Sequence, residues 1–484
     1  MHSKLLVAAS LSALASNAVV SAAGSERILG VYVFHRHGDR TAKAWAPVNL
    51  TALGADEVHS SGAFYRSRYV SSDADFRVAG LSAETAVLSQ LEVTSPKDAV
   101  LHNSALTFLQ GLYPPTDSLE VLANGTKVKA PLNGYQYIPI DSVSDAATSN
   151  KAESNAWLQG GSGCGNAVVS SNNYFTSPDY KQTYDDTKDF YQSLLPVIKG
   201  TYGPDATNFK NGYTIFDLIN VATIHNSSIS DNKLLTKETL ARLYNLASVH
   251  EWNLAYNSSD PVRAIAGSVL AGQIMDALQP IVDGKSSTPK FNAQFGAYGT
   301  FMAFFGLAQL PKASPDFYGI CDYASSMTFE LVTTSTDAKP KADDISVRFL
   351  FANGTAAEKG IKTFPLFGQD KDTLSWNDFK TGMSKFAISD TQHWCQLCGN
   401  TDGKCASNST GSGGDVAQNS TGSGSGGVSK PVAGVIGALV TLVVILGIQA
   451  LVMAIGGLRL VKKSTLAGAR RSGEVSEAGG VKSS

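Results

Sequence analysis

The feature that most constrains this chain is an abrupt change from apolar to charged sequence at residue 35. Residues 28–34 form a continuous apolar run, Ile-Leu-Gly-Val-Tyr-Val-Phe. Such a run, rich in β-branched and aromatic side chains, predicts a buried strand of a mostly parallel sheet. Residues 35–41 then read His-Arg-His-Gly-Asp-Arg-Thr. Ligands of open α/β sheets bind at the carboxyl ends of the strands, so the sequence predicts a binding site directly after this strand.

The residue types in the charged segment suit a phosphoryl group. Arg36 and Arg40 carry planar guanidinium groups, which donate several charge-assisted hydrogen bonds to phosphate oxygens. A neutral imidazole between them, that of His37, is able to attack phosphorus and form a covalent intermediate. The alternative is a surface turn in which the arginines pair with Asp39 and Asp56. This segment alone leaves both interpretations open.

Further motifs along the chain connect this segment to a known family. Residues 36–40, Arg-His-Gly-Asp-Arg, resemble the RHGxR signature of the histidine acid phosphatases, the second branch of the histidine phosphatase superfamily. Later segments resemble other motifs of that family: Leu-Thr-Ala-Leu-Gly at 50–54 with Arg-Ser-Arg-Tyr at 66–69, Ser-Ala at 104–105 with Gly-Leu-Tyr-Pro-Pro at 111–115, and the helical segment 259–267. The resemblance extends over residues 27–400.

The resemblance implies an α/β fold, with a mixed, mostly parallel central sheet, flanking helices and an inserted helical cap. It implies that His37 is the phospho-acceptor and that Arg36 and Arg40 bind phosphate, so the expected ligand is a phosphomonoester or phosphate. The chain has no Gly-rich nucleotide fingerprint, and His250-Glu251 has no second histidine at metal-ligand spacing. We therefore expect neither a cofactor nor a metal.

The chain departs from the family at two places. Val100 occupies the expected position of a third phosphate-binding arginine, with Lys97 close by, and Gln294 and Phe295 occupy the expected positions of a His-Asp pair that protonates the leaving group. A general acid typically contributes about 10²–10⁴-fold to the rate. Two functions therefore remain open: a phosphatase that acts through His37, or a catalytically impaired pseudophosphatase that serves as a binding or structural cell-surface glycoprotein.

The two ends of the chain carry targeting signals. An apolar run after Lys4 ends in small residues, as in a secretory signal peptide, although a buried first helix is an alternative. The 27 uncharged residues Val432–Leu458 are long enough to span a membrane, and the basic residues that follow predict a cytoplasmic tail. The predicted segments are a signal peptide (1–23), an ectodomain (24–400), a Ser/Gly/Asn-rich stalk (401–430), a transmembrane helix (431–458) and a cytoplasmic tail (459–484).

This order of segments predicts a single-pass type I membrane protein of the secretory pathway, with an extracellular or lumenal ectodomain. Seven Asn-x-Ser/Thr sequons support a glycosylated surface; they lie at Asn49, Asn124, Asn226, Asn257, Asn353, Asn408 and Asn419. The 39 basic and 41 acidic residues leave a formal net charge of −2, which argues against a nucleic-acid partner.

The five cysteines predict disulfides with one cysteine left unpaired, since the predicted compartment is oxidising. Cys395, Cys398 and Cys405 cluster next to His393. This cluster fits a zinc knuckle or a redox CxxC motif, but the interpretation we favour is a local disulfide that closes the end of the domain.

Overall fold

The computed structural model describes residues 26–143, 163–401 and 405–406. The predicted signal peptide, transmembrane helix and cytoplasmic tail lie outside these residues, as do nearly all of the stalk and the sequons at Asn408 and Asn419.

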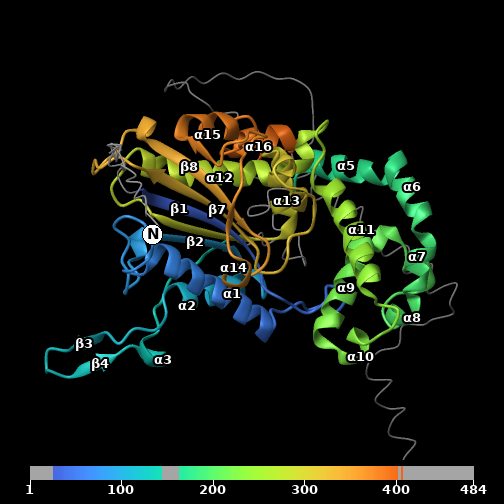
Figure 1. The fold of residues 1–484 in the computed structure, drawn as a ribbon, viewed down its shortest axis with the longest axis horizontal. Helices are drawn as coiled ribbons and strands as arrows, with labels where there is room; N and C mark the ends of the chain where they lie inside the picture. Colours follow the sequence, from blue (N-terminus) through green and yellow to red (C-terminus); the bar gives the residue numbers. More distant parts are fainter. Residues whose placement is uncertain (1–25, 144–162, 402–404, 407–484) are drawn as a thin grey trace, which may run out of the picture. The chain divides into compact units, whose positions relative to one another are not determined.

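An eight-stranded mixed sheet forms the centre of the described fold (Figure 1). Its strand order is β10-β8-β7-β1-β6-β2-β5, with β9 paired to β8. The parallel pairs are β1–β6, β6–β2 and β2–β5, while β7, β8, β9 and β10 pair antiparallel to their neighbours. The strands are β1 (Arg27–Arg36), β2 (Leu91–Pro96), β5 (Asp141–Val143), β6 (Phe291–Gly296), β7 (Ser326–Thr333), β8 (Ile345–Ala352), β9 (Lys362–Thr363) and β10 (Thr373–Ser375). The predicted mixed α/β sheet is confirmed.

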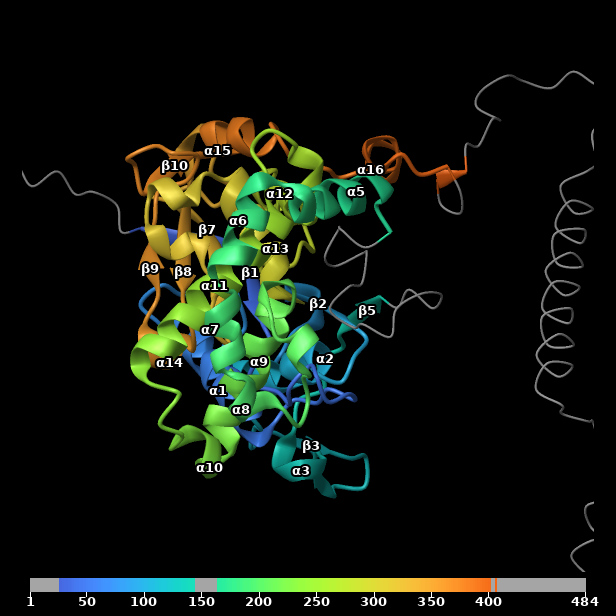
Figure 2. The ribbon, with the colours of Figure 1, turned by 90° about the vertical axis from the view of Figure 1, so that its right-hand side faces the viewer.

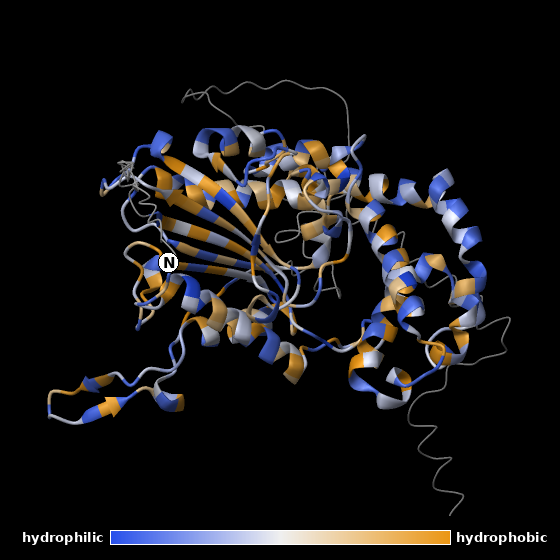
Figure 3. Cartoon of the chain, viewed as in Figure 1, coloured by the Kyte–Doolittle hydropathy of each residue, from blue (hydrophilic) through white to orange (hydrophobic). Residues whose placement is uncertain are grey.

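Helices cover both faces of this sheet because successive side chains of β1 point to opposite sides. Val31 and Val33 pack in a cluster with residues of α1 (Ala52–Tyr65) and α2 (Leu101–Leu112). Tyr32 and Phe34 pack in a second cluster with residues of α12, α13 and α15. Figure 3 shows the resulting concentration of hydrophobic residues along the central strands. The α-helices after residue 264 are α12 (Ile265–Val282), α13 (Tyr298–Leu307), α14 (Ala356–Lys359), α15 (Trp376–Met383) and α16 (Thr391–Cys398).

A helical segment is inserted between β5 and β6, as expected for a cap. Many of its buried side chains form a separate hydrophobic cluster that includes Tyr191, Phe209 and Leu243. Figure 2 shows its helices from the side that faces away from the sheet. The helices of the insertion are α5 (Gly165–Asn173), α6 (Pro178–Asp186), α7 (Lys188–Ser193), α8 (Leu195–Ile198), α9 (Gly212–His225), α10 (Ser227–Ser230) and α11 (Lys237–Ala255). A short hairpin of β3 (Leu119–Val121) and β4 (Lys127–Lys129), followed by α3 (Pro131–Gly134), projects from the opposite part of the sheet (Figure 1).

One helical segment of the described residues, Pro261–Val282, is long and apolar enough to cross a membrane. It is half buried, and Leu270, Ile274 and Leu278 on α12 belong to the core cluster on one face of the sheet. Its apolar character is therefore that of a core helix.

Two disulfides close the end of the domain. Cys395 bonds to Cys405, which confirms the local disulfide, and Cys398 bonds to Cys164 at the start of the helical insertion. Cys321 is a buried free cysteine. The zinc-knuckle interpretation is therefore wrong, because all three clustered thiols are in disulfides.

A buried ion cluster joins the end of α1 to the antiparallel half of the sheet. The π-helical turn Arg66–Val70 follows α1 and carries Arg68, whose Nη2 lies 2.9 Å from Oε1 of the fully buried Glu330 on β7. Tyr69 donates its hydroxyl to the same oxygen at 2.5 Å, and Arg348 on β8 donates Nε to Oε2 at 2.7 Å. The Arg-Ser-Arg-Tyr motif therefore has a structural role here.

Candidate functional site

His37 lies at the carboxyl end of β1, where the sequence predicted a site, and is fully buried. Its Nδ1 is 2.8 Å from the carbonyl oxygen of Gly38. Because a carbonyl only accepts, Nδ1 carries the proton and Nε2 carries the lone pair. This tautomer makes Nε2 the nucleophilic atom.

The turn after His37 requires glycine. A Cβ atom on Gly38 would meet the carbonyl oxygen of Gly54 at 2.1 Å, because the turn passes against the first turn of α1. Thr51 caps that helix by accepting the amide hydrogen of Gly54, and the Thr51 amide donates to the Asp39 carbonyl. The loop that holds His37 is therefore fixed to the helix.

Arg36 is 4% exposed and lies between two aromatic rings. Its guanidinium carbon is 4.7 Å from the centre of the Tyr323 ring and 5.4 Å from that of Tyr298. Its Nη1 donates to the carbonyl oxygen of Cys321. Among these contacts, a carbonyl dipole and two ring faces stabilise the charge of Arg36, and none is a carboxylate.

Arg40 is fully buried and, unlike Arg36, is paired with a carboxylate. Its Nη2 donates to Oδ1 of Asp217 on α9 at 2.7 Å and to the Tyr213 hydroxyl at 3.2 Å. The other Asp217 oxygen accepts the backbone amide of Lys43 at 2.8 Å. Asp217 therefore ties the loop after β1 to the helical insertion.

Tyr323 lies beside all three predicted site residues. Its ring centre is 5.6 Å from that of His37, 4.7 Å from the Arg36 guanidinium and 5.9 Å from the Arg40 guanidinium. The next residue, Ala324, has a left-handed φ of 57° and donates its amide to the His37 carbonyl at 2.9 Å. The ring therefore borders the place where a phosphoryl group bound by these three residues would lie.

A cavity of about 300 Å³ opens next to Arg36 and Tyr323. Tyr213 and Asp217 line it from α9 and Tyr244 lines it from α11. Two carboxyl groups, those of Asp217 and Asp322, lie in its wall. The cavity is a route by which a small anion reaches Arg36.

Titratable groups surround the motif loop. Glu57 accepts the Asp39 amide at 2.7 Å, and burial, followed by the charge of Asp39, raises the pKa of Glu57 to about 7. Oδ2 of Asp39 lies 2.6 Å from Nε2 of His225 and 2.5 Å from the Thr51 hydroxyl. On the strand itself, burial lowers the pKa of His35 to about 4. His35 is therefore neutral at ordinary pH and belongs to the core.

The structure places Val100 at the N-cap of α2, where it is buried. Oδ1 of Asp98 accepts hydrogen bonds from the amides of Val100 and Leu101, both at 2.7 Å. Asp98 therefore caps the helix in place of the Val100 side chain. Lys97 is exposed. No arginine occupies this turn.

Gln294 and Phe295 lie inside β6. Gln294 accepts the Tyr32 hydroxyl and donates to Gln273 at 3.0 Å, while the Phe295 ring packs 5.3 Å from His35. In the register of the sheet Arg36 is level with Gly296, and the next two residues of the chain are Ala297 and Tyr298. None of these side chains is a carboxylic acid.

Sequence reasoning missed the groups that come from distant segments. Asp217 had a signal: it is the single charged side chain in the apolar stretch 212–224, and a buried charge needs a partner. Tyr323 had none, because it lies in a loop whose path is set by the sheet. Among the described residues, no group of three or more His, Cys, Asp or Glu forms a metal site.

Comparisons with known proteins agree with this fold. A family model for the histidine phosphatase superfamily (branch 2) matches residues 43–352, starting just after the Arg-His-Gly-Asp-Arg motif. The apo phytase of Hafnia alvei superposes with a TM-score of 0.52 and 11% identity, covering 77% of this chain and 98% of that chain. The phytase of Citrobacter braakii gives a TM-score of 0.52 and 11% identity over 77% and 99%. No curated protein matches the sequence. At these identities the likeness to the solved structures concerns the fold.

Proposed function

Because the chain belongs to the histidine phosphatase superfamily (branch 2), we propose that it hydrolyses phosphomonoesters through a phosphohistidine at His37. The observation that carries this proposal is the tautomer of His37: its Nδ1 is held by the Gly38 carbonyl, so Nε2 is the basic atom beside two arginines. Arg36 and Arg40 would stabilise the charge on the phosphoryl oxygens.

The reaction has two steps. In the first, Nε2 of His37 bonds to phosphorus while the ester P–O bond breaks and the leaving oxygen takes a proton. In the second, water attacks the phosphohistidine, the N–P bond breaks and inorganic phosphate leaves. The Tyr323 ring would border the reacting group in both steps, because it lies beside His37 and both guanidiniums.

The proton donor of the first step would be Asp322. It lines the same cavity as Arg36 and is exposed, so it can exchange its proton with water. Asp217 is less suitable because its two oxygens accept from Arg40 and from the Lys43 amide. A carboxylic acid in this role contributes about 10²–10⁴-fold.

The test compares two substrates with the full-length protein. Asp322→Asn is expected to slow hydrolysis of an alkyl phosphate about 100-fold and that of p-nitrophenyl phosphate much less, since p-nitrophenolate leaves without a proton. His37→Ala is expected to abolish both activities, and the exposed Asp117→Asn serves as the control. Equal activity of the wild type and His37→Ala would contradict catalysis by His37.

A second candidate function is a pseudophosphatase that binds anionic ligands without turnover. The Tyr323 ring over the arginines and the non-acidic Ala297 and Tyr298 favour it. Under this alternative, phosphate or tungstate binds to the wild type and p-nitrophenyl phosphate is not hydrolysed.

We further propose that residues 431–458 anchor the protein as a type I membrane protein with the domain outside the cytoplasm. The support is the uncharged run Val432–Leu458 and the basic residues after it. Protease treatment of sealed membrane vesicles should digest the tail, residues 459–484, and leave the domain protected. Protection of the tail would contradict this orientation.

A further inference from the structure

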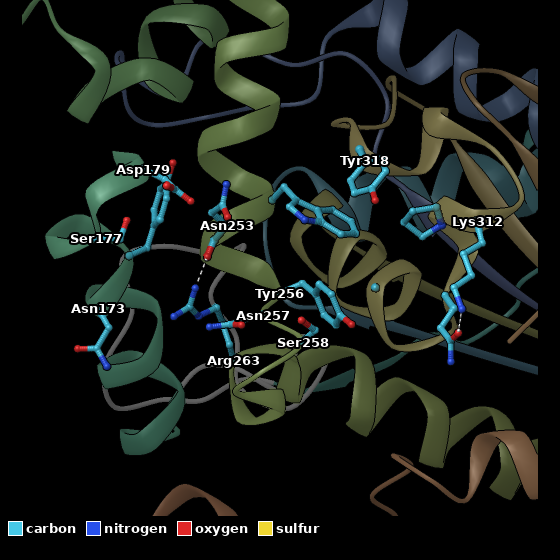
Figure 4. Close-up of a pocket in the computed structure, with 15 residues that line it drawn as sticks. Asn173, Ser177, Asp179, Asn253, Tyr256, Asn257, Ser258, Arg263, Lys312 and Tyr318 are labelled. Atoms are coloured by element: carbon cyan, nitrogen blue, oxygen red, sulfur yellow. Dashed lines mark hydrogen bonds between the residues drawn. The ribbon is translucent and has the colours of Figure 1, made fainter. Parts of the chain in front are cut away.

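A second cleft, of about 640 Å³, shares no lining residue with the cavity beside Arg36 and Tyr323 (Figure 4). An aromatic wall runs along it: the Trp252 ring centre is 5.4 Å from that of Tyr256 and 4.9 Å from that of Tyr318. The Tyr318 side chain is 52% exposed although it is aromatic. Rings held this way present apolar faces to a ligand.

The polar groups of this cleft suit a neutral ligand. The cation at one end, Arg263, already donates to the carbonyl oxygen of Asn253 at 2.7 Å and to the Ser170 hydroxyl at 3.1 Å. The other cation, Lys312, donates to the Gln309 side chain at 2.7 Å. The remaining groups are mainly amides and hydroxyls, with one carboxylate at Asp179. Aromatic faces with amides and hydroxyls match a polyhydroxylated molecule such as a sugar better than a phosphate ester.

A sugar attachment sequence borders the same cleft. Asn257-Ser258-Ser259 is a sequon, and Asn257 and Ser258 line the cleft next to Tyr256 (Figure 4). Oδ1 of Asn257 accepts the Ser259 amide at 2.9 Å, which fixes the direction of the side-chain amide. We propose that Asn257 carries an N-linked glycan whose first N-acetylglucosamine units lie in this cleft against Tyr256, Trp252 and Tyr318.

Covalent attachment makes this contact favourable even when the affinity for free sugar is low. A tethered ligand has a high effective concentration at a neighbouring site. The contact also covers apolar surface of the Trp252 and Tyr318 rings that otherwise faces water. The glycan then contributes to the stability of the junction between α11 and α13, which border the cleft.

The sequon at Asn124 offers a matched control. Its Oδ1 accepts the Thr126 amide at 3.0 Å, so its local turn resembles that of Asn257. It lies on the exposed β3–β4 hairpin, and a Cβ on the neighbouring Gly125 would meet nothing within 4 Å. A glycan on Asn124 has no comparable aromatic wall to contact.

The experiment uses the full-length chain expressed in eukaryotic cells. Mass spectrometry of glycopeptides measures the occupancy of Asn257, and thermal unfolding compares Asn257→Gln with Asn124→Gln. We expect Asn257 to be occupied and Asn257→Gln to lower the Tm by about 2 °C, with no change for Asn124→Gln. Trimming the glycan to one N-acetylglucosamine should preserve the Tm.

A second variant tests the contact itself. Tyr318→Ala removes an exposed ring from the wall, and Asn257→Gln should then have no further effect on the Tm. Free N-acetylglucosamine, titrated into the Asn257→Gln protein with tryptophan fluorescence as the readout, should bind only at millimolar concentration. The proposal would be overturned by an unmodified Asn257, by equal Tm losses for both sequon variants, or by additive losses with Tyr318→Ala. Micromolar binding of free sugar would also overturn it, because that result assigns the cleft to a separate saccharide.

Discussion

Two pairs of arginines in this fold differ in how their charges are paired with carboxylates. Arg68 and Arg348 share Glu330, each bonding to a different carboxylate oxygen, and Arg348 also pairs with Glu26 at 2.8 Å. The cluster thus has two cations and two carboxylates. Its arginines connect the sheet to the end of α1.

The pair at His37 is not balanced in this way. Arg40 pairs with Asp217, but Arg36 contacts a carbonyl oxygen and two aromatic rings. The carboxylate of Asp39 is turned toward Thr51 and His225. The comparison teaches that the arginine best suited to a ligand is Arg36, because its hydrogen bond and ring contacts include no carboxylate.

The largest effect on stability is expected at the cluster of Arg68, Arg348, Glu330 and Glu26, which we call the balanced cluster. Glu330→Ala leaves Arg68 and Arg348 without their buried carboxylate, and removing one partner of a buried ion pair typically costs about 3–5 kcal/mol. Urea unfolding should show this loss of stability, and added phosphate should not restore it. Restoration by phosphate would break the distinction between the two pairs.

The next effect concerns Asp217, the carboxylate that pairs with Arg40. We call Arg36 and Arg40 the ligand pair. Asp217→Asn keeps a hydrogen-bonding oxygen for the Arg40 guanidinium but removes the negative charge. We expect inorganic phosphate to bind about tenfold more tightly, which corresponds to about 1.4 kcal/mol. Isothermal titration calorimetry measures this, with the exposed Asp117→Asn as control. Weaker binding in Asp217→Asn would mean that Asp217 orients Arg40 for the ligand.

Much of the arginine site could be predicted from sequence because its core is local. The strand predicted at 28–34 is the centre of β1 (Arg27–Arg36), and His37, Arg36 and Arg40 follow it within a few residues. The partners are not local. The register between β1 and β6 joins residues about 260 apart in the chain, and it depends on tertiary packing. That is why Tyr323 was not found from the sequence.

Tyr323 provides a smaller test of the same comparison. Its ring faces the Arg36 guanidinium, whereas in the balanced cluster the Tyr69 hydroxyl is bound to Glu330. Cation–π contacts are worth about 1 kcal/mol, so Tyr323→Ala should strengthen phosphate binding about fivefold. Tyr323→Phe keeps the ring and should leave the affinity unchanged. Weaker binding in Tyr323→Ala would show that the ring positions Arg36 instead of covering it.

The smallest effect is the change in folding stability with pH that arises at the loop carrying Arg36 and Arg40. Burial raises the pKa of Glu57 from 4.5 to about 7, and its carboxyl group holds the Asp39 amide beside Arg40. A raised carboxyl pKa in the folded state means that the contribution to stability is complete below pH 4.5 and is lost as the pH rises through 7. Because the side chain is partly exposed, solvent screening reduces the expected loss to less than about 1 kcal/mol. In Glu57→Gln this part of the pH dependence should disappear, which unfolding free energies at pH 5 and pH 8 measure. The exposed Glu84→Gln is the control, and an unchanged pH dependence in Glu57→Gln would assign the effect to another group of the loop.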